Sequence, residues 1–103
     1  MIPGTSSQSI KSLTYQADHL SVYFENDWYQ ENIAALITLL LSPIMPVTMQ
    51  ENIIGADREN IRFSWQEHYF VLNFDYYSQS CWLEGRGSKS TESLANLYAE
   101  LEK

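Results

Sequence analysis

The chain of 103 residues carries 13 acidic and 6 basic side chains, which gives a formal net charge of −7 at pH 7. A chain of this length forms one domain, and folding buries enough of its surface to build a core without disulfide or metal support. The acidic charge argues against nucleic-acid binding, because phosphate contacts require clustered Lys and Arg.

The first quarter of the chain begins with polar sequence and continues with strand-like alternation. Residues 1–10 are rich in Ser, so we expect a flexible N-terminal arm, followed by a single α+β domain over residues 11–103. Apolar and polar residues alternate in residues 13–15 and again in residues 20–24, which predicts β-structure. The pattern fits either a hairpin or one bent strand.

A helix is predicted over residues 28–42. Asp27 is a suitable N-cap, Gln30 stands three residues later as in a capping box, and Pro43 ends the segment. Four apolar residues have the spacing of one buried helical stripe: Ile33, Leu36, Ile37 and Leu40. The apolar run here is interrupted by proline and falls short of the roughly 18–20 residues that a membrane-spanning helix needs, so we expect no membrane contact.

Residues 43–60 have the weakest pattern in the chain. Alternation from Met45 to Met49 predicts a short edge strand, and the prolines of this segment exclude a helix interior. Residues 51–60, around Gly55, predict a loop or turn that leads into the next strand.

The clearest pattern lies in residues 61–85, which predict three antiparallel strands joined by short turns. The side chains of the first two strands that we expect to face the core are Ile61, Phe63, Trp65, Phe70, Leu72, Phe74 and Tyr76. The third strand contains Cys81 and Leu83, and Gly85 ends it.

A glycine-rich turn, GRGSKS, connects this three-stranded segment to a second predicted helix. Ser90 is its expected N-cap, and its apolar stripe consists of Leu94, Leu97, Tyr98 and Leu101. The turn does not match a nucleotide-binding P-loop, which needs a Gly-Lys pair, because Ser88 precedes Lys89. Arg86, Lys89 and Ser90 remain a weak candidate for an anion site at the helix N-terminus, and simple helix capping is the favoured interpretation.

No residue pattern predicts catalysis. A reactive thiol would require Cys81 beside His19 or His68, and nothing in the spacing brings these residues together. Neither histidine has a second metal ligand at the usual spacing, and the acids are scattered singly. We therefore expect a protein that is not an enzyme and has no metal or cofactor.

The outer face of the three-stranded segment is the predicted functional surface. If Phe70 and Phe74 face the core, the side chains on the opposite face are Tyr69, Val71, Asn73 and, from the third strand, Trp82. Tyr and Trp supply a large contact area with few rotamers to freeze, so such a face predicts protein binding or homodimerisation if it is open. The alternative is that the N-terminal arm or residues 43–60 cover this face.

The expected fold is an α+β two-layer sandwich in which two helices pack on one face of a four- to five-stranded, mainly antiparallel sheet, in the order β-α-(β)-β-β-β-α. The single cysteine and the absence of a signal-peptide pattern predict a cytoplasmic protein. The favoured function is non-catalytic protein interaction or homodimerisation through the open sheet face. The alternatives are a small-ligand pocket between sheet and helices, and an acidic inhibitor or immunity-type protein for a basic partner.

Overall fold

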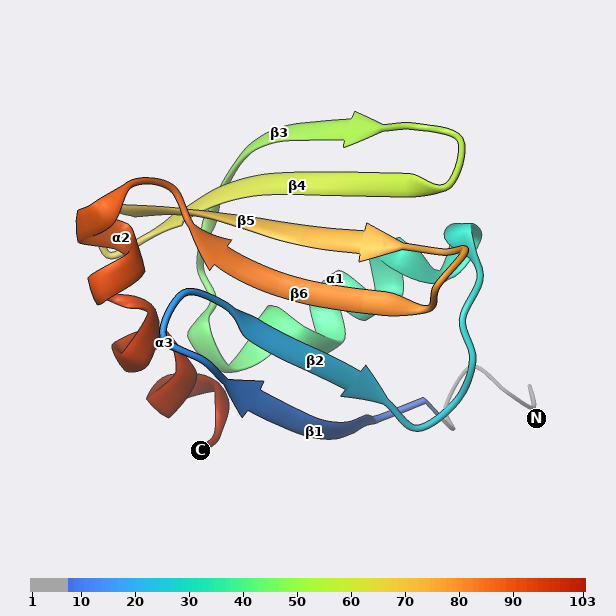
Figure 1. Ribbon diagram of the computed structural model, residues 1–103, viewed down its shortest axis with the longest axis horizontal. Coiled ribbons are helices and arrows are strands. Elements are labelled where there is room, and N and C mark those ends of the chain that lie inside the picture. Colours follow the sequence, from blue (N-terminus) through green and yellow to red (C-terminus); the bar gives the residue numbers. More distant parts are fainter. Residues whose placement is uncertain (1–7) are drawn as a thin grey trace.

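A six-stranded antiparallel sheet with helices on one face forms the protein, in a computed structural model that describes residues 8–103 (Figure 1). The predicted α+β class is confirmed, although the sheet has more strands and the chain more helices than predicted. The strands are β1 (Ile10–Tyr15), β2 (Leu20–Phe24), β3 (Thr48–Ile54), β4 (Arg58–Trp65), β5 (His68–Asp75) and β6 (Ser80–Gly85). The helices are α1 (Ile33–Leu41), α2 (Ser88–Glu92) and α3 (Leu94–Leu101), with 3-10 turns at Gln30–Asn32 and Ser42–Ile44.

The strands lie in the order β1-β2-β6-β5-β4-β3, and every neighbouring pair is antiparallel. Residues 10–24 therefore form a hairpin, which settles the alternative that the sequence left open. The second strand of this hairpin, β2, pairs with β6, the last strand in the chain, with Leu20 opposite Leu83. Residues 1–7, most of the predicted N-terminal arm, lie outside the described residues, while the Gln8 side chain donates to the Asn26 carbonyl at 2.9 Å.

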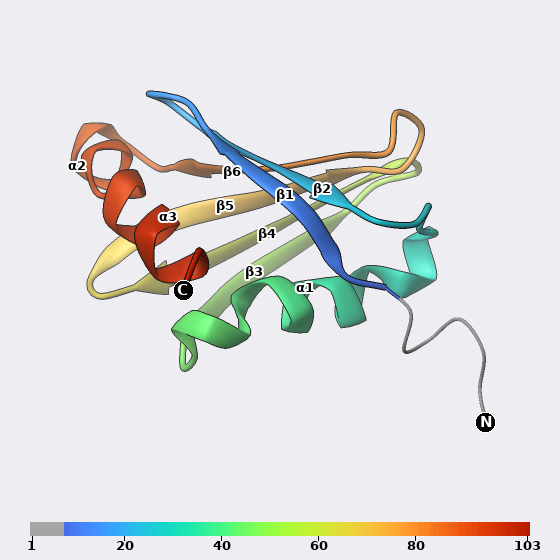
Figure 2. The same cartoon turned by 90° about the horizontal axis from the view of Figure 1, so that it is seen from below.

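The core lies between the sheet and the helices, which Figure 2 shows below the sheet. Phe70, Leu72 and Phe74 are buried, so the predicted core face of β5 is confirmed. Tyr76 was predicted on the same face and is instead exposed, because β5 ends at Asp75 and the chain turns there. No helix among the described residues is long and apolar enough to cross a membrane.

The first helix begins later than predicted. α1 starts at Ile33, after a 3-10 turn in which the Asn32 side chain accepts a hydrogen bond from the Tyr29 N–H at 2.8 Å. Asp27 is therefore not the N-cap, because the backbone of Trp28 bonds to the Gln79 side chain instead of entering a helical turn. The C-terminal boundary was predicted well, since α1 ends at Leu41, close before Pro43.

In residues 43–60 an edge strand is present as predicted, but β3 begins later than predicted and, with the start of β4, occupies most of residues 51–60, where a loop was expected. The edge strand β3 shows no apolar alternation because all its residues are exposed. In β4 the first core-facing position is Glu59, which is buried and accepts a hydrogen bond from the Asn52 side chain at 2.9 Å. Because both of these positions are polar, the apolar alternation that identifies a strand is missing from this part of the sequence.

The C-terminal helical segment is broken into two helices and begins before the predicted cap. Gly87, with φ of 90°, precedes α2, so the prediction of Ser90 as N-cap is wrong. Ser90 lies inside α2, where its hydroxyl accepts a hydrogen bond from the Tyr69 N–H at 3.0 Å. The predicted stripe of the second part is confirmed at Leu94, Leu97 and Leu101, which are buried.

Candidate functional site

The sheet face opposite the helices carries no layer from the described part of the chain. Figure 2 shows α1 and α3 beneath the sheet and α2 at its end. Within residues 43–60, the alternative cover for this face, residues 48–54 and 58–60 are themselves strands of the sheet. We call this surface the open face.

The structure places all of the predicted interaction residues on the open face. Tyr69 is 47% exposed, whereas Val71 and Trp82 are half-buried and Asn73 is only 5% exposed. Asn73 and Trp82 stand opposite each other across β5 and β6. Tyr23 of β2 is 52% exposed on the same face. Alternation within β2 places Tyr23 on the outward side, but its position near β6 depends on the pairing of β2 with β6.

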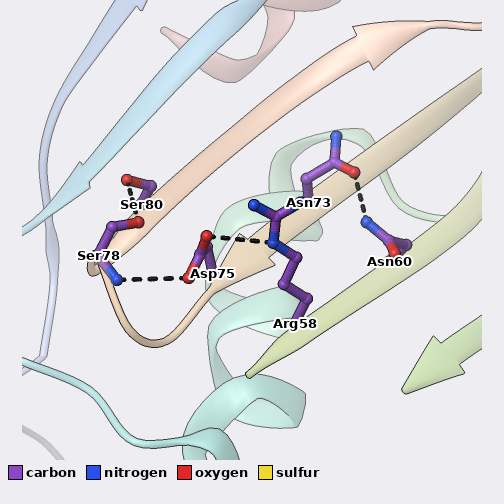
Figure 3. A network of polar contacts seen from close by, with 6 residues as sticks. All are labelled: Arg58, Asn60, Asn73, Asp75, Ser78 and Ser80. Carbon is purple, nitrogen blue, oxygen red and sulfur yellow. Dashed lines mark hydrogen bonds and ion pairs between the residues drawn. The ribbon is translucent and has the colours of Figure 1, made fainter. Parts of the chain in front are cut away.

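A hydrogen-bonded polar row crosses the centre of the open face. The Asn60 side chain donates to the side-chain Oδ1 of Asn73 at 2.6 Å. The side-chain Nδ2 of Asn73 donates to Glu84 Oε1 at 3.2 Å and to the backbone carbonyl of Trp82 at 3.4 Å. Asn73 is thus fully engaged although it is buried among strands, as a buried amide must be to avoid a large desolvation penalty. Figure 3 shows Asn60 and Asn73 pointing toward each other from β4 and β5.

Two ion pairs lie beside this row, between residues of neighbouring strands. Arg58 Nε lies 3.2 Å from Asp75 Oδ2, and Arg62 lies 3.3 Å from Glu51. Asp75 also accepts a hydrogen bond from the Ser78 N–H at 3.3 Å, which anchors the β5–β6 turn to the strand (Figure 3). The middle of the open face is therefore polar, and its aromatic side chains lie around this polar row.

A groove of about 470 Å³ lies along β2 and β6, and Tyr23, Trp82 and Glu84 are among its lining residues. Asp18 and His19 contribute to its lining from the β1–β2 turn. The His19 ring lies 2.8 Å from the Asp18 carboxylate, and this hydrogen bond lowers the pKa of Asp18 below its ordinary value. Aromatic side chains and carboxylates therefore both line the groove.

A second hollow, of about 360 Å³, lies between α1 and the edge strand β3. It is lined by Ile37, Met49, Gln50, Glu51, Asn52 and Ile61. None of these residues is Trp or Tyr.

The three residues of the weak anion candidate, Arg86, Lys89 and Ser90, border one hollow. Arg86 and Lys89 are exposed beside a hollow of about 610 Å³ that Glu67 also lines. Ser90 is buried, and its hydroxyl already accepts the Tyr69 N–H. The helix that follows, α2, has only 5 residues, so its dipole adds little to anion binding.

His19 and Cys81 both border the groove along β2 and β6, but among the described residues no hydrogen bond joins the thiol to either imidazole. Cys81 is a free, buried cysteine on the core side of β6, and burial raises the pKa of its thiol. His19 lies in the β1–β2 turn, and His68 begins β5. Within residues 8–103 there is no group of three or more His, Cys, Asp or Glu residues that could hold a metal ion.

A family model described as a protein of unknown function (DUF3630) matches residues 10–102. The chain belongs to this family. The DUF3630 match extends from the first residue of β1 to the residue after α3, so it includes the whole sheet and all the helices. No curated protein and no solved structure matches the chain.

Proposed function

We propose that this DUF3630 protein is a non-catalytic, cytoplasmic protein-binding domain that uses its open face. The observation that carries the proposal is the groove of about 470 Å³ along β2 and β6, on a sheet face that the helices leave uncovered. Tyr23 and Trp82 line the groove, and Tyr69 lies on the same face.

The composition of the open face favours a protein partner. Protein interfaces combine aromatic contact residues with polar groups that are satisfied or paired. Tyr23 and Tyr69 are exposed aromatic residues that could make such contacts. The polar side chains of the Asn60–Asn73–Glu84 row are already paired by hydrogen bonds. Because these hydrogen bonds already hold the polar side chains in place, binding would freeze few additional rotamers.

A second copy of the chain is the alternative occupant of the open face. The face carries both Arg58 and Glu84, so two copies can place opposite charges against each other. The net charge of −7 opposes this association at low ionic strength, because two acidic copies repel each other. A different protein is therefore the favoured partner.

Site-specific photo-cross-linking in the native host tests the proposal. A benzophenone amino acid replaces Tyr69 on the open face in one variant and Ala35, an exposed residue of α1, in a matched control. We expect a discrete protein adduct from position 69 and none from position 35. The mass of the adduct distinguishes a second copy of the chain from another protein, and sedimentation velocity of the purified protein checks self-association independently.

A second substitution shows whether the adduct depends on the groove. Trp82→Ala is combined with the photoreactive group at position 69, and we expect the adduct to fall at least roughly fivefold, the loss of one aromatic contact residue at an interface. Far-UV circular dichroism confirms that the variant is folded. Adducts of equal yield from positions 69 and 35, or an adduct indifferent to Trp82→Ala in a folded variant, would overturn the proposal.

A further inference from the structure

Exposed tyrosines gather at one end of the sheet, around the β5–β6 turn and beside the end of the groove on the open face. Tyr29 is 56% exposed, Tyr76 36% and Tyr77 87%. They lie where the β5–β6 turn meets the segment before α1, at the right of Figure 1. We call Tyr29, Tyr76 and Tyr77, with the buried Trp28 behind them, the tyrosine end.

The rings of the tyrosine end are arranged around a shallow hollow. The ring centres of Tyr29 and Tyr76 are 6.0 Å apart with the planes tilted by 41°, and those of Trp28 and Tyr76 are 6.3 Å apart. The hollow measures about 340 Å³, and Asp27, Tyr77 and Gln79 complete its lining. Aromatic rings and a carboxylate therefore border the same space.

Hydrogen bonds to the backbone hold these segments in place. The Gln79 side chain bonds to both the N–H and the carbonyl of Trp28, each at 2.9 Å. The Tyr76 N–H donates to the Asp57 carbonyl at 2.8 Å, and the Gln30 side chain donates to the Gly55 carbonyl at 3.2 Å. A partner would thus meet side chains on a preorganised backbone, which reduces the entropy lost on binding.

The charge at this end is negative. Asp27 lines the hollow, Asp57 contacts Tyr76 through its backbone, and Glu31 lies in the 3-10 turn that follows Tyr29. The ion pairs formed by the described residues use other acids, namely Asp18, Glu51, Asp75 and Glu100. The nearby cation, Arg58, is held by Asp75. The carboxylates of the tyrosine end are therefore available to a cationic partner.

We propose that the tyrosine end binds an arginine side chain from a basic segment of a partner protein. A guanidinium group stacks on aromatic rings, is attracted by their π faces and pairs in a planar, bidentate geometry with a carboxylate. The rings of Tyr29 and Tyr76 and the carboxylate of Asp27 offer both kinds of contact around one hollow. The hollow shares Gln79 with the groove on the open face but none of the groove's aromatic residues, so the two proposals can be tested separately.

An NMR titration with a short peptide tests the inference. The probe is acetyl-Gly-Arg-Gly-Arg-Gly-amide, and the control peptide carries citrulline in place of each arginine, which keeps the shape and removes the charge. We expect the arginine peptide to shift the amide signals of residues 27–31 and 76–79, with an affinity that falls as salt is added, and the citrulline peptide to bind at least roughly fivefold more weakly.

Matched variants separate a specific site from general attraction to an acidic protein. We expect Tyr29→Ala and Tyr76→Ala each to weaken binding roughly two- to fivefold, as the loss of a cation–π contact implies. Tyr69→Ala, on the open face, serves as the ring control and should leave the affinity unchanged. Asp27→Asn should weaken binding more than Glu102→Gln, which makes the same charge change on an exposed residue just after α3.

Three results would overturn the inference. The first is equal affinity for the arginine and citrulline peptides. The second is an equal effect of Asp27→Asn and Glu102→Gln, which would indicate nonspecific electrostatic attraction. The third is a set of shifts centred on Tyr23, Tyr69 and Trp82, which would assign the peptide to the open face instead.

Discussion

The side chain of Gln79 pairs with the backbone of Trp28 as a neighbouring strand would. Its Oε1 accepts the Trp28 N–H and its Nε2 donates to the Trp28 carbonyl, both at 2.9 Å. This pair ties the β5–β6 turn to the segment before α1. It also holds the Trp28 ring against Phe74, with ring centres 5.5 Å apart and planes at 82°. A single side chain thus joins one end of the sheet to the helical layer.

We expect Gln79→Glu to lower the free energy of unfolding by about 1–2 kcal/mol, because it removes the donor to a partly buried carbonyl and places a carboxylate beside it. Urea unfolding followed by circular dichroism and tryptophan fluorescence measures the change. Gln50→Glu, an exposed residue of the edge strand β3, is the matched control and should stay within about 0.5 kcal/mol of the parent. Equal losses in the two variants would show that the pairing contributes nothing beyond charge.

Asn73→Asp should destabilise the open face without changing side-chain size. The substitution removes the donor to Glu84 and the Trp82 carbonyl and places two carboxylates side by side. We expect a loss of about 2 kcal/mol at pH 7, part of which returns at low pH as the carboxyl groups are protonated. Asn96→Asp, at an exposed position of α3, is the control. A loss no larger than that of Asn96→Asp would contradict the role assigned to the polar row.

Gly85 is where β6 passes closest to α2. A Cβ atom at this position would lie 2.5 Å from the backbone of Ser90 and Thr91, so the helix or the strand would have to move. We expect Gly85→Ala to lower stability by about 2–3 kcal/mol or to prevent folding. Gly55→Ala places its Cβ at 3.5 Å from the Arg58 carbonyl, an ordinary contact, and should be tolerated. Similar melting temperatures for the two variants would be incompatible with this close approach.

Stability should decrease at alkaline pH through Cys81. Burial raises the pKa of this thiol, so the folded protein keeps it protonated while the unfolded chain, with an ordinary pKa of about 8.5, releases the proton. The stabilisation is complete below the unfolded pKa and is lost as pH rises. We expect a loss of about 1 kcal/mol between pH 8.5 and 9.5.

Urea unfolding at each pH measures this decrease in the free energy of unfolding. Cys81→Val should abolish the part of the decrease that is caused by ionisation of the thiol. Alkylation of Cys81 by iodoacetamide should be roughly 100-fold slower in the folded protein than in urea, because the thiolate forms only when the chain opens. Rapid alkylation of the folded protein would show that the thiol is accessible.

The sequence predicted β5 and its neighbours well because each of these strands has one apolar face. Phe70, Leu72 and Phe74 alternate with Tyr69, Val71 and Asn73, and that alternation is local, so it can be read without knowing the neighbours. The same rule failed in residues 48–60. There the edge position of β3 removes the buried face, and the Glu59–Asn52 pair puts polar side chains on the core side.

The candidate surfaces were predictable only in part. The residues that point away from the core on β5 and β6 follow from alternation, but the polar row across them does not. Asn60 meets Asn73 because β4 and β5 pair in one particular register. Tyr29 meets Tyr76 because the Gln79 side chain holds the segment before α1 at the β5–β6 turn. Neither contact leaves a signal in the sequence around the residues concerned.

Four features follow from composition or from spacing along the chain: the α+β class, the two faces of the central strands, the apolar stripes of α1 and α3 and the acidic charge. Three others exist only in the folded protein: β2 lies beside β6, Asn73 bonds to Asn60 and Glu84, and tyrosines from separate segments share one hollow. These features depend on strand order and register, which are set by contacts between distant residues as the whole core packs.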